Sequence, residues 1–119
     1  MAKSAHELVA ERFGVRARVL ENPAATSVGT SSVVVARRNP NRYVAVFMNI
    51  GATNIFLRPN RAATVTAGVR LAANGGSLSM DVETDFILPA QEWNAIGDSG
   101  GGVLFILFIE GEPGGEEDE

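Results

Sequence analysis

The sequence predicts an all-β protein: an antiparallel β-sandwich or jelly-roll-like domain of about eight short strands, with a short N-terminal helix and arm and an acidic C-terminal tail of the disordered type. Two observations support this prediction. Between residues 31 and 110, runs of β-branched and aromatic residues recur at the spacing of strands, separated by Gly, Pro and Asn. The chain has 119 residues, 45% of them hydrophobic, which suits one domain with one core.

Residues 1–30 are predicted to be an N-terminal helix followed by an arm. Ser4 and Glu7 have the spacing of a capping box, which begins helices. The apolar face of this short helix is too small to fold alone, so we expect it to dock on the rest of the chain or on a partner. That face consists of Leu8, Val9 and Phe13.

The β-domain, residues 31–110, begins with Val33–Ala36. Tyr43–Ile50 is apolar on both faces, as in a strand that is covered on both sides, and we predict that it forms a hairpin with Asn54–Leu57. Asn74-Gly75, with Gly76, supplies left-handed residues for a tight turn. The remaining expected strands are Ala63–Thr66, Val69–Ala72, Ser77–Val82, Phe86–Leu88, Trp93–Ile96 and Val103–Ile109, of which the last should be the most buried.

Charge is distributed unevenly along the chain. All ten Lys and Arg residues lie at or before Arg70, with three acidic residues among them, whereas eleven acidic residues and no basic ones follow. The acidic tail, residues 111–119, is the extreme of this pattern. The two halves attract each other, and this attraction is consistent both with neutralisation within one chain and with head-to-tail contact between copies.

A basic rim is expected at one end of the domain. Pro40-Asn41-Arg42 and Pro59-Asn60-Arg61 bracket the predicted hairpin, so its two strands should bring both tripeptides to the same end. The rim would consist of five arginines and would suit a partner's carboxylates or phosphates; ordinary solvated loop charge is the alternative. These arginines are Arg37, Arg38, Arg42, Arg58 and Arg61. The candidate interaction residues are Arg16, Arg18, Arg37, Arg38, Arg42, Arg58 and Arg61. We expect no nucleic-acid partner, because the net charge is -4 and one Tyr and one Trp offer few platforms for stacking on bases.

One motif has the appearance of a catalytic site. Gly97-Asp98-Ser99-Gly100-Gly101 resembles the sequence around the nucleophile of trypsin-like serine proteases. That chemistry needs a His base and an orienting carboxylate, and the only histidine, His6, lies in an unrelated motif. We therefore interpret the pentapeptide as a tight turn before a buried strand, and we expect no catalytic residues and no enzymatic activity.

Metal and cofactor sites are not expected either. The chain has one His and no Cys, so the usual zinc ligands are missing. Asp81, Glu83 and Asp85 alternate, and we interpret them as the solvated face of a strand in preference to a calcium site. No phosphate-binding glycine motif precedes a helix. Trp93 is expected to pack as a lid on the core, with a ligand platform as the alternative.

No membrane partner is expected. The longest apolar stretch, Val103–Ile109, is far shorter than the roughly 20 residues that span a bilayer. The start of the chain, Met1-Ala2-Lys3-Ser4, lacks the apolar run of a secretory signal.

Six segments between residues 42 and 110 follow one another in a pattern of core and turn residues: Arg42–Gly51, Asn54–Leu57, Gly68–Leu71, Gly75–Leu78, Trp93–Gly97 and Gly101–Leu107. This pattern resembles the β-sandwich of small virion proteins of tailed bacteriophages. The resemblance implies a virion structural protein, either a capsid decoration (cement) protein or a head-associated accessory protein. Such a protein is made in the host cytoplasm and sits on the particle surface as a homo-oligomer, bound to the major capsid protein or to neighbouring copies. A carbohydrate-binding or receptor-binding module of a tail or fibre tip is the alternative.

Overall fold

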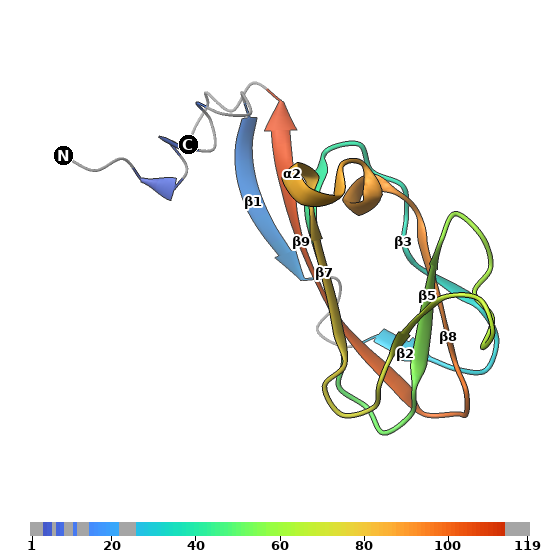
Figure 1. The fold of residues 1–119 in the computed structure, drawn as a ribbon. Helices are drawn as coiled ribbons and strands as arrows, with labels where there is room; N and C mark the ends of the chain where they lie inside the picture. Colours follow the sequence, from blue (N-terminus) through green and yellow to red (C-terminus); the bar gives the residue numbers. More distant parts are fainter. Residues whose placement is uncertain (1–3, 6, 9–10, 12–14, 22–25, 114–119) are drawn as a thin grey trace.

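The computed structural model describes residues 4–5, 7–8, 11, 15–21 and 26–113. Within these residues the chain is mostly antiparallel β-strand in two sheets, with little helix, as the all-β prediction requires (Figure 1). The elements are β1 Val15–Glu21, β2 Thr26–Val28, β3 Val33–Ala36, β4 Arg42–Asn49, β5 Ile55–Pro59, β6 Val69–Leu71, β7 Ser77–Asp81, α2 Val82–Asp85, η1 Leu88–Ala90, β8 Trp93–Gly97 and β9 Gly102–Pro113.

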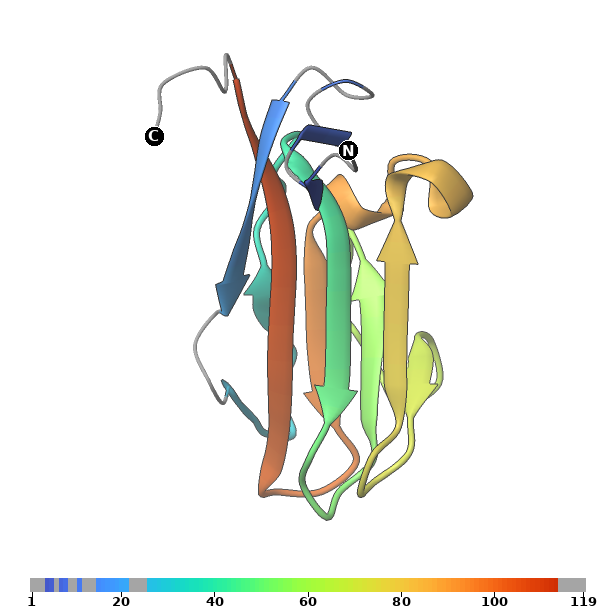
Figure 2. The ribbon, with the colours of Figure 1, turned by 90° about the vertical axis from the view of Figure 1, so that its left-hand side faces the viewer.

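The first sheet has the order β1-β9-β4-β7, with β2 also paired to β9, and the second sheet has the order β3-β8-β5-β6. Figure 1 shows the two sheets nearly edge-on, and Figure 2 shows the first sheet face-on. The predicted hairpin is wrong, because β4 pairs with β7 and β9 whereas β5 pairs with β6 and β8. The turn at Gly51 carries the chain from one sheet to the other, so that both strands bury a face in the same core.

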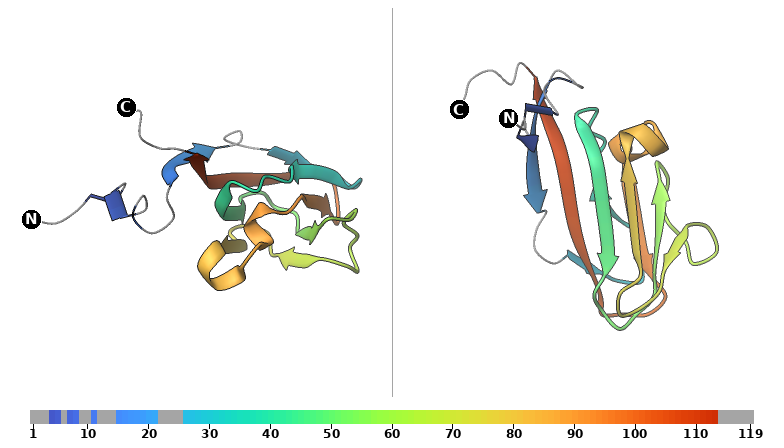
Figure 3. Two further views of the ribbon diagram at one scale, coloured as in Figure 1. Left: turned by 90° about the horizontal axis from the view of Figure 1, so that it is seen from above. Right: turned by 60° about the vertical axis from the view of Figure 1, so that its left-hand side comes forward.

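The core lies between the sheets and follows the two-residue period of the strands. On β9, Leu104, Ile106 and Phe108 are buried, whereas the residues between them are partly exposed. From the second sheet, Ile55 and Leu57 are completely buried against them. Figure 3 shows the two layers from above and from the side.

Several expected elements differ from those in the structure. Ala63–Thr66 forms only an isolated bridge, between Thr64 and Ala67. Phe86–Leu88 lies in the connection from α2 to η1. Strand β9 continues to Pro113, through three residues that we had assigned to the acidic tail, because β1 pairs with it along this length. Residues 114–119 lie outside the described residues.

Much of the predicted arm belongs to the first sheet. Strands β1 and β2 both pair with β9, one after the other along the same edge. Their backbone groups find partners there although the local sequence has only a weak strand pattern.

The capping box is present at the start of the predicted helix: the Ser4 amide donates to Glu7 Oε1 at 2.7 Å, and the Glu7 amide donates to Ser4 Oγ at 3.1 Å. The rest of that helix lies largely outside the described residues.

A buried amide organises the opposite end of β4. Asn49 is completely buried; its Nδ2 donates to the carbonyls of Thr53 (2.7 Å) and Leu71 (3.0 Å), and its Oδ1 accepts from the Gly51 amide at 3.1 Å. The turn predicted at Asn74 and Gly75 is confirmed, with φ of 62° and 124°. The Asn49 bonds tie the crossing from β4 to β5 to the crossing from β6 to β7.

The pairing of β1 and β2 gives a truncation test. At protein concentrations low enough for the chain to be monomeric, deleting residues 2–13 should change the free energy of unfolding by less than about 1 kcal/mol, because no described strand is lost. Deleting residues 2–30 should abolish cooperative unfolding, because it removes both strands and completely buried Val28. Thermal and urea denaturation followed by circular dichroism measures both effects. Cooperative melting of the longer deletion near the native midpoint would show that these strands contribute little.

Candidate interaction surfaces

The two arginine-bearing tripeptides, residues 40–42 and 59–61, lie at one end of the domain, as predicted. The Asn39 amide donates to the Ala90 carbonyl at 2.9 Å, and the Asn60 amide donates to the Glu92 carbonyl at 2.8 Å. Both connections therefore attach to the segment that contains η1. The exposed members of the predicted rim at this end are Arg37, Arg38 and Arg61.

Arg42 is not part of a rim, because it is buried with 5% of its surface exposed. Its Nη1 donates to the carbonyls of Pro89 (3.2 Å) and Gln91 (3.3 Å), and its Nη2 to the carbonyl of Arg37 (2.8 Å). The guanidinium carbon lies 4.1 Å from the centre of the Phe108 ring. Burial lowers the pKa of Arg42, and the nearby Glu110 carboxylate partly offsets that shift. A β-bulge between Arg42 and Val44 breaks the strand alternation at this point.

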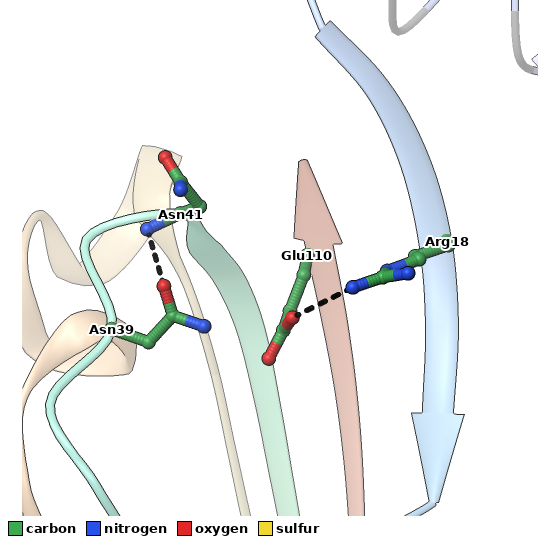
Figure 4. Close-up of polar contacts among 4 residues, drawn as sticks. All are labelled: Arg18, Asn39, Asn41 and Glu110. Atoms are coloured by element: carbon green, nitrogen blue, oxygen red, sulfur yellow. Dashed lines mark hydrogen bonds and ion pairs between the residues drawn. The ribbon is translucent and has the colours of Figure 1, made fainter. Parts of the chain in front are cut away.

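Arg18 lies in the same cross-strand row as Arg42. Glu110 on β9 is in register with Arg18 on β1 and with Arg42 on β4. Arg18 Nη2 lies 3.9 Å from Glu110 Oε1 (Figure 4). Figure 4 also shows the Asn41 amide donating to Asn39 Oδ1, at 2.9 Å, in the turn before β4. A basic residue from the first half of the chain thus pairs with an acidic residue from the second half within one molecule.

The remaining two candidate arginines differ. Arg58 is partly exposed, and its Nη1 donates to the Ala62 carbonyl at 3.3 Å. Arg16 lies opposite Glu112 in the β1–β9 register, and its side chain is outside the described part of the structure. Of the five arginines predicted for the rim, Arg42 is therefore buried and Arg58 is partly exposed, whereas the other three are exposed.

The serine motif forms the loop between β8 and β9, as its interpretation as a turn predicts. Ser99 Oγ lies 3.2 Å from Thr53 Oγ1, which also donates to the Gly100 carbonyl at 3.0 Å. These bonds tie the loop to the turn that follows β4. His6 lies outside the described residues.

The three alternating carboxylates do not form a strand face, because β7 ends at Asp81 and α2 follows. Asp81 Oδ1 accepts from the Thr84 amide at 2.8 Å, and Asp85 Oδ2 accepts from the Asp81 amide at 3.0 Å. This reciprocal capping stabilises a helical turn and outweighs the strand alternation. No cluster of three metal-ligating side chains occurs among the described residues.

Trp93 is a core residue. It is 3% exposed, its ring centre lies 5.9 Å from that of Phe47, and its Nε1 donates to the Leu88 carbonyl at 3.0 Å. The expectation of a core lid is confirmed. Within the described part of the chain, no helix is long and apolar enough to cross a membrane.

The outer face of the first sheet is apolar over its two middle strands, β4 and β9. Its side chains are partly or fully exposed, in contrast to the alternating residues that face the core. A single chain therefore covers only one face of the strand that we predicted to be covered on both. The residues of this face are Val44, Val46, Met48, Val103, Phe105, Leu107 and Ile109.

A second exposed apolar surface, which we call the tip, consists of Phe86, Ile87 and Leu88. These consecutive residues are 75%, 69% and 40% exposed. They follow α2, which stands out from the β7 edge of the domain (Figure 3). We had predicted a strand here; three adjacent bulky apolar residues were the signal that could have identified the surface.

The tip has an unusual backbone. Phe86 has φ 59° and ψ -117°, and Ile87 has φ -94° and ψ 3°. These are the angles of the two central residues of a type II′ turn, whose first central position normally requires glycine. A phenylalanine held at this position stores strain of roughly 1–3 kcal/mol.

Comparison of the chain with protein-family models, curated proteins and solved structures gives no significant match.

Replacing Arg42 tests its structural role. Arg42→Met keeps most of the apolar stem but leaves three carbonyls and Glu110 without the guanidinium, so the free energy of unfolding should fall by about 3 kcal/mol. The matched exposed control, Arg38→Met, should change it by no more than about 0.5 kcal/mol. Urea denaturation measures both. Equal stability of the two variants would contradict the role assigned to the buried guanidinium.

Phe86→Gly should stabilise the protein, which is the reverse of most substitutions of large apolar residues. Glycine relieves the strained turn, and because Phe86 is exposed little packing is lost; after the entropy cost of a new glycine, we expect a gain of about 1 kcal/mol. Val65→Gly, at another exposed loop position, should instead destabilise. A loss of stability in Phe86→Gly, measured by urea denaturation, would mean that the ring is structural.

Proposed function

We propose that this chain is a structural protein of a tailed-bacteriophage particle, attached to the particle surface as a capsid decoration or other head-associated accessory protein. It would act through contacts with the major capsid protein or with neighbouring copies, without catalysis. The proposal is supported by the resemblance of residues 42–110 to small virion proteins and by the tip. The sequence resemblance gives the setting, and the tip gives a contact surface.

The finer fold assignment within this proposal is a jelly roll. Strands β2-β9-β4-β7 and β3-β8-β5-β6 form two four-stranded layers, with β1 as an additional edge segment. Most connections cross between the layers, which is the arrangement of eight-stranded jelly rolls. Jelly rolls occur in viral capsid proteins and in lectins, so the fold is compatible with both functions considered from the sequence.

The tip is the observation that carries the choice of protein contact. Exposed apolar residues on a strained backbone are typical of binding segments, where strain that lowers stability is retained for function. Acidic Asp85 directly precedes Phe86, which disfavours an anionic membrane surface and favours a protein partner with an apolar pocket and basic surroundings. Trp93 is buried, so it cannot serve as the aromatic platform considered for the carbohydrate-binding alternative.

The experiment compares tagged native chain with Phe86→Gly for incorporation into phage particles, in a phage whose genome encodes the chain among its head and tail genes. Native chain should co-sediment with purified particles, and Phe86→Gly should be reduced at least tenfold although it folds more stably. Val65→Gly serves as the control and should incorporate normally. Absence of the native chain from particles would overturn the proposed function, and normal incorporation of Phe86→Gly would overturn the role of the tip.

A further inference from the structure

An open groove of about 290 Å³ lies at the α2 end of the outer face of the first sheet. Its floor is apolar and comes from three neighbouring strands: Ala17 of β1, Ile109 of β9 and Val44 of β4. Val82 and Thr84 of α2 line it further, and the carboxylate residues Asp81 and Glu83 also line it. In Figure 2 the strands that form this floor face the viewer, with α2 at their upper end. The groove is thus an apolar trough that carries negative charge.

The sequence before β1 has the complementary pattern. In a helix that begins at Ser4, residues 5, 8, 9, 12 and 13 share one face by their spacing of three and four. Apart from Arg12, this face is apolar, and Glu7 and Glu11 fall on the opposite side. An apolar helix face with a central arginine matches an apolar groove that carries two carboxylates. The capping hydrogen bonds of Ser4 and Glu7 support a helix start there.

We propose that the groove binds the N-terminal segment, residues 4–13, of a second copy of this chain. In a single chain Leu8, a described member of this face, is 53% exposed and does not line the groove of its own molecule. Residues 4–13 precede β1, the edge strand that contributes Ala17 to the groove. Reciprocal exchange between two copies would bury both grooves around one two-fold axis and give a closed dimer.

This inference deepens the proposed assembly role, because it assigns one contact between copies, and it uses a surface separate from the tip. Arg12 is expected to lie near Glu83 of the other copy, and Leu8 and Phe13 to lie over the apolar floor. Helix-in-groove binding of this kind depends on a few anchors spaced along one helix face.

Crosslinking gives a direct test, because the chain has no cysteine. Leu8→Cys and Thr84→Cys are made as separate single variants, mixed and treated with a short bismaleimide. The mixture should form a covalent heterodimer, at least tenfold more than a mixture of Leu8→Cys with Val69→Cys, an exposed position on the second sheet. Equal crosslinking in both mixtures would overturn the proposal. So would a Leu8→Cys, Thr84→Cys double variant that crosslinks only within single chains.

Sedimentation equilibrium of the purified chain tests the same contact without crosslinks. Native protein should dimerise, deletion of residues 2–13 should leave a folded monomer, and Arg12→Glu should weaken the dimer at least tenfold. Combining Arg12→Glu with Glu83→Arg should restore dimerisation, whereas Arg70→Glu, a charge reversal at an exposed position on the second sheet, should have little effect. Dimerisation that persists after the deletion would overturn the proposal. These measurements use no phage particle, so their failure is distinct from failure of the proposed function.

Discussion

The buried Arg42 guanidinium is the interaction on which one end of the domain depends. It joins the backbone of three segments, the end of β3, the start of β4 and the turn around η1, through the carbonyls of Arg37, Pro89 and Gln91. Its planar donors can satisfy carbonyls in several directions while its face lies on Phe108, a combination that lysine could not provide. A charged group therefore packs against the core at this end of the domain, between the Phe108 ring and the backbone around η1.

Strand β9 has more strand partners than any other strand of the first sheet. It also brings acidic residues of the second half of the chain next to basic residues of the first half. It pairs with β1 and β2 on one side and with β4 on the other. The basic first half and the acidic second half of the chain meet on it, as the Arg18–Glu110 pair shows. At this position the opposite charges of the two halves neutralise each other within one molecule. The exposed arginines near η1, which are Arg37, Arg38 and Arg61, can contact other molecules.

Most strands could be predicted, because runs of β-branched and aromatic residues bounded by Gly, Pro and Asn favour the extended backbone. The assignment of strands to sheets could not, since a turn such as Gly51–Thr53 serves equally well for a hairpin and for a crossing between layers. Asp81 was misread because local capping can override side-chain alternation. Arg42 was predicted to be an exposed loop residue. That prediction was wrong because the β-bulge at the start of β4 directs its side chain into the core. The strained backbone of the tip could not be predicted, because the sequence does not give backbone angles.

The central position of β9 has a consequence for folding during synthesis. β1, β2 and β4 all take β9 as a direct partner, so these earlier strands remain incompletely paired until residue 113 has emerged from the ribosome. Such long-range pairing makes folding slow and leaves apolar strand edges accessible meanwhile. The second sheet, complete once β8 at residues 93–97 is available, can form earlier and act as a template for the first.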